Sequence, residues 1–416
     1  MKIRGFAIHS NIMTTMKIND IAHLCGYFST SRTDLFKTIA SDSFWTPVTY
    51  TAEDAEIGKR FYFQEFVDLC MYEVKAFTHV CSQAINVPMR DGSVRHAVLT
   101  DLRLYLYPFG MVMYSIGVRQ DDVMLQDALQ VLSALRMTFS VTGDTDFEKY
   151  AIKPLMDMCK VAGAVKLMES GNKFKLFQVV VSDGEAVQKE EMDRLLFSAG
   201  TLTMYDETDG MSFTKDYFEG IMSQGRLSVF RNWGALSLLD TFTIYAFCPK
   251  EYMLDVWRED YFSKLYLYNL FRKFFLFRLN HRFRADASRI SHLKDELETF
   301  DRSYSFPILS YNFLPELVVK SMEKGLDIED EKEKITVMVN QEKDRKEAAT
   351  GDRMNLFLGV ISCLTLFSAI WDFACLMDGM FVFGDTIGTV TGFRACTMLI
   401  LAIMCMIILM TRWARK

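Results

Sequence analysis

The sequence lacks the short motifs that most often identify an enzyme. Its six histidines are isolated, and HExxH, the phosphate-binding GxxxxGK[ST] and the dinucleotide-binding GxGxxG are all absent. A catalytic group could still assemble from residues far apart in the chain, but no pattern indicates one. We therefore predict that the protein is not an enzyme.

Paired cysteines are also missing. The nine cysteines include no CxxC, and four of them lie inside or beside two apolar runs near the end of the chain. They are expected to act as small apolar residues in a reducing compartment, not as zinc ligands or a redox couple. The sequence contains no pattern that predicts a cofactor, and it does not identify a metal.

Charge disappears from those two apolar runs. Met354 to Trp371 and Ala395 to Thr411 contain no ionisable group except cysteine thiols. A helix rises about 1.5 Å per residue and the hydrocarbon layer is about 30 Å thick, so each run with its flanks can cross a bilayer. We predict a first span over 354–377, an outer loop over 378–394 and a second span over 395–412.

Basic residues predict how these spans are oriented. Arg345, Lys346 and Arg353 precede the first span, Arg412, Arg415 and Lys416 follow the second, and Arg394 alone lies between them. Because cytoplasmic flanks carry the excess of Lys and Arg, both termini are predicted to be cytoplasmic. The N-terminus has no apolar run typical of a secretory signal. We expect a multi-pass protein of the cell inner membrane, in contact with membrane lipid.

The remaining chain divides by its residue pattern. Residues 1–250 mix strands and helices, including an alternating hairpin over 94–107 and 111–118 and a helix over 121–139. This pattern predicts a cytosolic α+β domain with a largely antiparallel sheet, suited to regulation or ligand sensing. Residues 251–353 are predicted to form long stalk helices, the last of which enters the first span without a break.

Two charged stretches in the predicted stalk allow more than one interpretation. The aromatic helix over 261–285 carries Arg272, Lys273, Arg278, Arg282 and Arg284. Packing against the stalk or contact with anionic lipid is favoured over direct nucleic-acid binding, because the helix has heptad spacing and precedes a membrane anchor. The acidic stretch over 327–333 is expected to be a solvated helix face, or a site for regulatory divalent ions between subunits.

Polar side chains in the first span follow a heptad repeat. Four of its five polar residues share one seam, Asn355, Ser362, Thr365 and Asp372, with Ser368 outside it, and we call the four the polar stripe. Such a stripe is typical either of helix packing through small polar residues or of a water-filled pore lined by several copies of the helix. The second span has no matching stripe, and small or polar residues continue the stripe backward into the stalk, so the pore is favoured.

Asp372 lies about 27 Å along the helix from Met354, near the predicted outer interface. The carboxylate either reaches water there or forms part of a ring that attracts cations. Asp378 and Asp385 follow closely. The outer mouth is therefore predicted to be acidic under both interpretations.

These segments together resemble the CorA-like divalent cation channels. The resemblance is carried by a large cytosolic domain, a stalk helix continuous with the first of two C-terminal spans, and the dipeptide Gly379-Met380 beside Asp378. It implies a funnel-shaped homopentamer whose polar stripe faces the axis and which passes divalent cations such as Mg²⁺. The family has Gly-Met-Asn at its outer mouth, whereas Phe381 replaces the asparagine here, so magnesium selectivity is not predicted.

A changed mouth and an unfamiliar front domain are expected of the CorA-like effectors associated with type III CRISPR systems. That resemblance implies an antiviral channel opened by a nucleotide second messenger, an AMP conjugate of S-adenosylmethionine. An adenine nucleotide requires arginines for its phosphate and an aromatic face for its base. The candidate ligand-binding residues are Arg95, Arg103, Arg119, Arg231 and Trp233.

Two alternatives remain open. One is a constitutive or ion-regulated Mg²⁺ transporter, and the other is a membrane-anchored sensor or scaffold without a pore. A tether would oligomerise weakly and tolerate leucine at Thr365 or Asp372. A channel would form a stable ring whose ion flux changes with the same substitutions.

Overall fold

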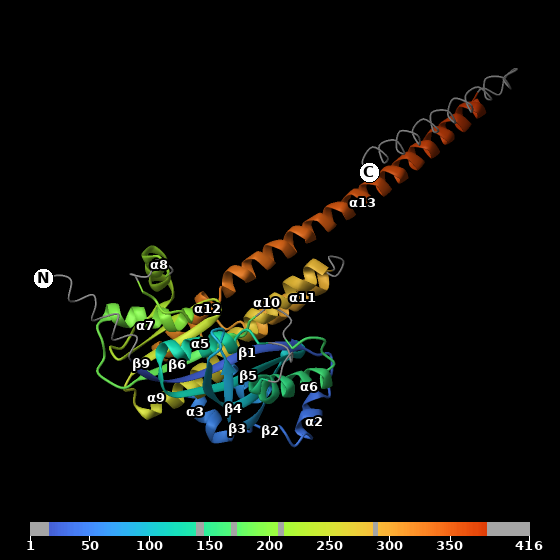
Figure 1. Cartoon of the computed structure of the whole chain (residues 1–416). Coiled ribbons are helices and arrows are strands. Elements are labelled where there is room, and N and C mark those ends of the chain that lie inside the picture. The colour runs from blue at the N-terminus through green and yellow to red at the C-terminus, as the bar shows by residue number, and fades with distance from the viewer. Residues whose placement is uncertain (1–15, 139–144, 168–172, 207–211, 286–289, 381–416) are drawn as a thin grey trace. The chain divides into compact units, whose positions relative to one another are not determined.

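The computed structural model describes residues 16–138, 145–167, 173–206, 212–285 and 290–380. The chain divides into two compact units, Met1–Val337 and Met338–Lys416. The described part of the first unit contains one mixed sheet with helices, and the described part of the second belongs to a single long helix (Figure 1).

The strands are β1 (Lys17–Ser29), β2 (Thr46–Pro47), β3 (Lys75–Pro88), β4 (Val94–Tyr107), β5 (Met111–Met124), β6 (Lys175–Ser182), β7 (Arg226–Leu227), β8 (Trp233–Ser237) and β9 (Thr241–Phe247). The α-helices are α2 (Leu35–Ala40), α3 (Ala52–Lys59), α4 (Gln64–Asp68), α5 (Leu125–Leu135), α6 (Lys153–Val161), α7 (Lys189–Thr201), α8 (Lys215–Gly225), α9 (Glu251–Asp255), α10 (Leu267–Ala285), α11 (Ile290–Tyr304), α12 (Phe313–Gly325) and α13 (Ile328–Met380). Shorter helical segments of other types are η1 (Leu69–Glu73), η2 (Pro108–Gly110), η3 (Glu148–Ile152) and η4 (Val256–Tyr266).

The sheet has the order β2-β3-β4-β5-β1-β6-β9-β8-β7. Its neighbouring strands are antiparallel except for β6 and β9, which run parallel. This confirms the predicted mixed fold with a largely antiparallel sheet. The predicted helix over 121–139 was wrong at its start, because Asp121 to Met124 continue β5 and stay paired with β1 as far as Met124.

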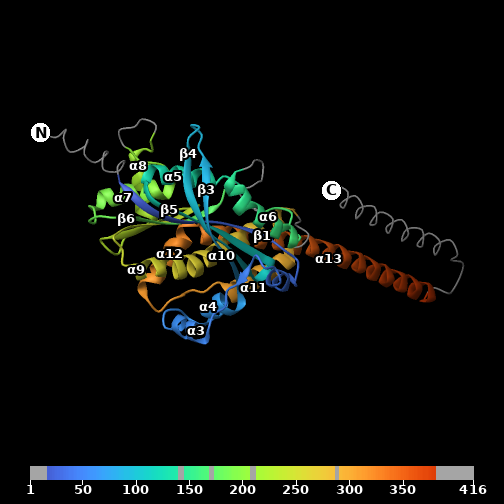
Figure 2. The same ribbon diagram turned by 60° about the horizontal axis from the view of Figure 1, so that its bottom comes forward.

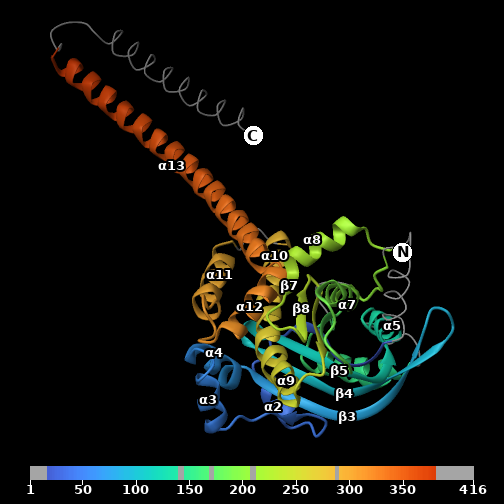
Figure 3. The ribbon, with the colours of Figure 1, turned by 90° about the vertical axis from the view of Figure 1, so that its left-hand side faces the viewer.

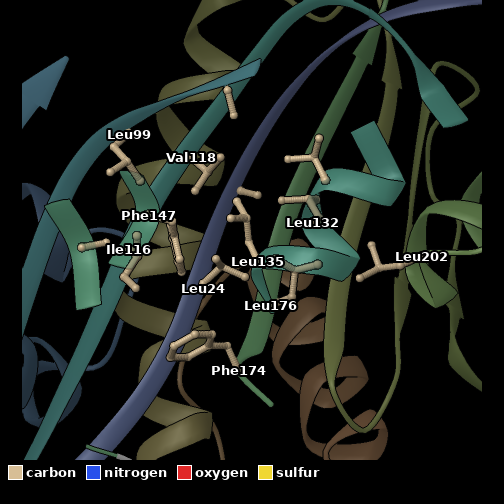
Figure 4. Close-up of a cluster of buried hydrophobic side chains, with 14 of the residues drawn as sticks. Leu24, Leu99, Ile116, Val118, Leu132, Leu135, Phe147, Phe174, Leu176 and Leu202 are labelled. Atoms are coloured by element: carbon tan, nitrogen blue, oxygen red, sulfur yellow. The ribbon is translucent and has the colours of Figure 1, made fainter. Parts of the chain in front are cut away.

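One face of the sheet carries the main hydrophobic core. Alternate β1 side chains, including Leu24 and Phe28, point to this face and pack with residues of α5, α6 and α7. Figure 4 shows Leu24 among Leu132 and Leu135 of α5 and Phe174 and Leu176 near the start of β6. Burying each such side chain contributes about 1.5 to 3 kcal/mol, so this face stabilises the first unit.

The opposite face is covered by an aromatic layer from η4 and α10. His23 stacks on Phe262 with ring centroids 3.8 Å apart, and Tyr27 stacks on Phe274 at 4.4 Å. In Figure 2, α5, α6 and α7 lie on one side of the sheet and α9, α10 and α12 on the other. The aromatic helix predicted to open a stalk therefore packs on the sheet, and the chain divides at Val337, not at residue 250.

α13 is unbroken over its 53 residues and carries the chain from the first unit into the second (Figures 1 and 3). Gly351–Phe373, which we call the apolar segment, is long and apolar enough to cross a membrane, and none of it is buried. The structure thus contains one candidate span where the first was predicted. The second predicted span, 395–412, and most of the outer loop, 378–394, lie outside the described residues.

Candidate functional site

The polar stripe lies on an uninterrupted helix and is exposed along its length. All four residues, Asn355, Ser362, Thr365 and Asp372, are solvent-exposed in the single chain. Because each residue advances a helix by about 100°, the four positions fall within an arc of roughly 100°. Asn355 and Asp372 are separated by about 25 Å along the axis, close to the thickness of the hydrocarbon layer.

The other side of the apolar segment is hydrophobic. Val360, Phe367 and Trp371 lie roughly opposite the polar stripe, and the rings of Phe367 and Trp371 are 6.2 Å apart. Phe357 and Leu364, between the two sides, are 63% and 57% exposed. In lipid, this distribution gives the helix one apolar side and one side on which polar residues alternate with apolar ones such as Leu358 and Ala369.

The polar groups of the stripe differ in what they require. The Thr365 hydroxyl donates to the carbonyl oxygens of Ser362 and Ile361, at 2.9 and 3.1 Å, so its own helix satisfies it. Asp372 is the more demanding group, because it is a carboxylate: at the bilayer centre it would cost about 2.5 to 3.5 kcal/mol, and near the predicted outer interface it needs access to water. An aqueous environment or a water-filled oligomer axis removes that cost.

The predicted outer mouth falls at the end of α13. Asp378, Gly379 and Met380 belong to its last turn, whereas the sequence predicted a loop from residue 378. A single glycine lowers helix stability by only about 1 kcal/mol, which is too little to end a long helix. Phe381 lies outside the described residues.

The arginines predicted to bind a nucleotide are not gathered at one site. Arg95 pairs with Asp127 of α5 at 3.0 Å, on the core face of the sheet. Arg103 pairs with Asp101 at 2.6 Å and lies 4.0 Å from Glu259 of η4, on the opposite face. Each guanidinium is matched by a nearby carboxylate.

The other predicted ligand residues are equally separate. Arg119 pairs with Asp121 on β5 at 2.9 Å. Arg231 lies on the β7–β8 turn, and Trp233 is 3% exposed and packs edge-on against Trp257 at 5.4 Å. The buried indole has no open face on which a base could stack.

Sequence reasoning missed an ion-pair cluster with two buried cations at the start of α13. It consists of Arg272 and Lys273 of α10 with Glu323 of α12 and Glu329 and Glu331 of α13, and we call it the ion-pair cluster. Arg272 contacts Glu323 and lies 2.9 Å from Glu329, while Lys273 lies 2.5 Å from Glu331. The two cationic side chains are only 3% and 2% exposed.

The carboxylates of the ion-pair cluster explain why two adjacent cations, Arg272 and Lys273, can be buried in the aromatic helix α10. Burial lowers the pKa of Arg272, but Tyr268, Glu323 and Glu329 raise it further, so the guanidinium stays charged. A buried charge of this kind is tolerated only when it is paired. The acidic stretch over 327–333 is therefore not simply a solvated face: Glu331 is 14% exposed and holds α13 to α10.

The turn between α12 and α13 is tightly built. Asp327 adopts a left-handed conformation with φ of 57°, and Lys273 donates to its carbonyl at 3.4 Å. At Gly325, a Cβ atom would lie 2.1 Å from Ser237 Oγ, so only glycine lets the end of α12 approach β8 this closely. The turn that precedes α13 thus has the end of α12 against β8 on one side and Lys273 of α10 on the other.

Comparisons with known proteins add no family assignment. No protein-family model matches this chain, and no curated protein matches it. Over the described residues, no group of three or more His, Cys, Asp or Glu side chains is arranged to hold a metal ion. The CorA-like resemblance and the expected divalent cation therefore remain predictions from the sequence.

Proposed function

We propose that the chain is one subunit of a CorA-like membrane cation channel, with α13 lining the pore and the first unit controlling its opening. The observation that carries this proposal is the exposed polar stripe within the apolar segment. A lone anchor helix gains nothing from such a stripe, and packing against one other helix would use only part of it. In a ring of identical chains, each stripe faces water along the axis while the apolar side meets lipid.

The pentamer is implied by the CorA-like resemblance, and the negative charge of the stripe favours a cation as the permeating ion. A ring of Asp372 carboxylates would attract cations and replace part of their hydration shell. Mg²⁺ and other divalent cations are the ions that the resemblance implies. Because Phe381 stands where the family has asparagine, we propose a cation pore without assigning it the selectivity of a magnesium transporter.

Control by the first unit is supported by the ion-pair cluster, which attaches the start of α13 to α10. Within the CorA-like group, we place the chain with the type III CRISPR-associated effectors, because its mouth departs from Gly-Met-Asn. The opening signal would then be a nucleotide second messenger, the AMP conjugate of S-adenosylmethionine, and the role antiviral defence. This assignment rests on the resemblance alone.

Liposome flux tests the pore directly. The full chain is reconstituted with a cation-sensitive dye inside the vesicles, and Ser362→Leu and Asp372→Asn are compared with the original protein. Ser368→Leu is the matched control, because Ser368 lies on the same helix outside the polar stripe. We expect the two stripe variants to change cation flux and the control to leave it unchanged.

Subunit number is measured alongside by native mass spectrometry in detergent, where the proposal requires a stable ring. A monomer, together with vesicles that stay tight with the AMP conjugate and with Mg²⁺, would reject the channel and leave the membrane-anchored sensor. Equal flux in Ser362→Leu, Asp372→Asn and Ser368→Leu would show that this helix does not line the pore.

A further inference from the structure

A cavity of about 1360 Å³ opens in the first unit, away from every arginine predicted to bind a ligand. Its walls are the end of β1, the turn after α6, the start of β6 and the C-terminal half of α10 with α11. We call it the α10–α11 cavity. Its volume exceeds the range of roughly 300 to 1,000 Å³ that is usual for small-molecule sites. The cavity therefore has room for a ligand larger than a mononucleotide.

The charges around this cavity are mainly positive. Six cations line it, Lys166, Lys173, Lys175, Arg278, Arg282 and Arg284, against four carboxylates, Asp240, Asp295, Glu296 and Glu331. His281 and His292 also face the space. The lining therefore carries a net positive charge in a protein whose overall charge is -6.

One cationic end of the cavity is centred on Asp240. Its carboxylate lies 2.5 Å from Lys175 and 3.0 Å from Arg136, and it also pairs with Lys173. Burial raises the pKa of Asp240, but these cations lower it further, to about 2, so the group stays ionised. One carboxylate shared by three cations leaves an excess of positive charge at this end.

The other cationic end is centred on Glu296 of α11. Arg278 and Arg282, one turn apart on α10, lie 3.1 and 2.6 Å from its two oxygens. Arg278 also donates to the carbonyl of Phe109 at 2.6 Å, which fixes its guanidinium. Two arginines on one carboxylate again leave positive charge, and an arginine fork matches the oxygens of a phosphate group.

The cavity also contacts the start of α13 through one residue. Glu331 lines the cavity and at the same time holds Lys273 at 2.5 Å. An anion entering the cavity would repel Glu331 and attract Lys273. The ion pair that attaches the first turn of α13 to α10 is therefore sensitive to negative charge in the cavity.

We propose that the α10–α11 cavity binds a small phosphate-bearing molecule with two or more negative charges, and that its binding weakens the Lys273–Glu331 ion pair. The second part rests on the proposed function, in which the first unit controls α13. Such a ligand favours the state in which the Lys273–Glu331 pair is broken only if it binds that state more tightly than the state in which the pair is intact.

Binding is tested on the purified full chain in detergent by isothermal titration calorimetry. The probes are inorganic tripolyphosphate and ATP, with uncharged adenosine as the control ligand. We expect both anions to bind and adenosine not to bind. ATP binding more tightly than tripolyphosphate would identify a nucleotide, whereas equal affinities would identify the phosphate chain as the recognised group.

Two variants assign the binding to the cavity. Lys173→Gln and Arg282→Gln remove one cation from each end, and we expect each to weaken binding by about tenfold or more. Their side chains are 46% and 38% exposed, so both variants should keep the melting temperature of the original protein. Arg119→Gln, outside the cavity, is the matched control and should bind normally.

Failure to bind either anion, or equal affinity in Lys173→Gln, Arg282→Gln and Arg119→Gln, would overturn the site. This measurement needs no ion flux. Tight vesicles would therefore reject the channel without affecting the binding site, and absent binding would reject the site without affecting the channel.

The link to α13 is tested by hydrogen exchange over residues 328–337. We expect saturating tripolyphosphate to speed amide exchange there in the original protein. In Glu331→Gln, which weakens the ion pair without the anion, exchange should already be fast and change little on binding. A protein that binds tripolyphosphate with unchanged exchange in this helix would reject the link and keep the site.

Discussion

The sheet of the first unit and the apolar segment of α13 use similar residues in opposite ways. Leu24 and Trp257 are fully buried by their own chain, whereas Phe357 and Leu364 are more than half exposed. Both regions are rich in large hydrophobic side chains, so composition does not separate them. The difference lies in what covers them: the first unit closes its own core, and the apolar segment is left uncovered by the described residues.

Charged groups show the same contrast. In the first unit, ionisable side chains such as Asp20 and Arg272 are almost wholly buried and are held by neighbours of the same chain. In the second unit, Arg345 is 80% exposed and pairs with Glu342 one turn away. Substitutions in the first unit should therefore change its stability, and matched substitutions in the second should not.

The largest effect is expected from the hydrophobic core. Leu24→Ala removes a buried side chain between the sheet and α5, which should lower the free energy of unfolding by about 3 to 5 kcal/mol through lost transfer energy and a residual cavity. Urea denaturation in detergent, followed by tryptophan fluorescence, measures it. Leu364→Ala in the apolar segment is the control and should change the value by less than about 0.5 kcal/mol. Equal losses would show that the apolar segment is part of the same folding unit.

The next effect depends on pH. Burial raises the pKa of Asp20 from its usual 3.8 to about 7, partly offset by hydrogen bonds from Gln178 and Gln120. The stabilising contribution of the neutral acid is thus fully present below pH 3.8 and is lost as pH rises through about 7. The asparagine of Asp20→Asn cannot ionise. At pH 8 the free energy of unfolding of this variant should therefore be higher than that of the original protein, by up to about 4 kcal/mol.

The same measurement at pH 3.5 should show little difference between Asp20→Asn and the original protein, because both side chains are then neutral. Asp372→Asn, at an exposed carboxylate of the second unit, should leave the pH dependence unchanged. A loss of stability in Asp20→Asn at pH 8 would mean that the charged carboxylate is favoured at this position.

A smaller effect is expected at the ion-pair cluster. Arg272→Met leaves Glu323, which is 22% exposed, without its cation and should cost about 2 kcal/mol, whereas Glu329, which is 62% exposed, keeps its contact with water. Arg345→Met removes an exposed pair and should cost less than about 1 kcal/mol. The melting temperatures of Arg272→Met and Arg345→Met are compared by thermal unfolding in the same detergent. Equal melting temperatures would show that the buried ion pairs of α10 stabilise the protein no more than an exposed pair does.

Patterns within one segment were predictable from the sequence. The hairpin of β4 and β5, the mixed sheet and the first candidate span follow from alternation or from the absence of charge over consecutive residues. The continuity of α13 through Arg353 follows from the absence of proline. Each of these features is decided by neighbours along the chain.

Features that depend on distant neighbours were not predictable. The aromatic positions of α10 look the same whether a sheet or another helix covers them, so the sequence did not distinguish a stalk from a sheet-packed helix. The sequence could not show that the predicted arginines lie apart or which carboxylates they pair with, such as Asp127 for Arg95. The α10–α11 cavity brings Lys175 and Arg282 together from positions more than 100 residues apart, and no spacing rule finds such a pair.

The position of β1 has a consequence for how the chain is made. This strand lies in the interior of the sheet, yet it precedes the other described strands along the chain, and its neighbours β5 and β6 begin only at Met111 and Lys175. Until they emerge from the ribosome, β1 has two unpaired edges, the state in which strands aggregate. Pairing with β5 covers one edge of β1 once residue 124 has been made, and the other edge stays open until β6 follows, so the sheet can be completed only after Ser182.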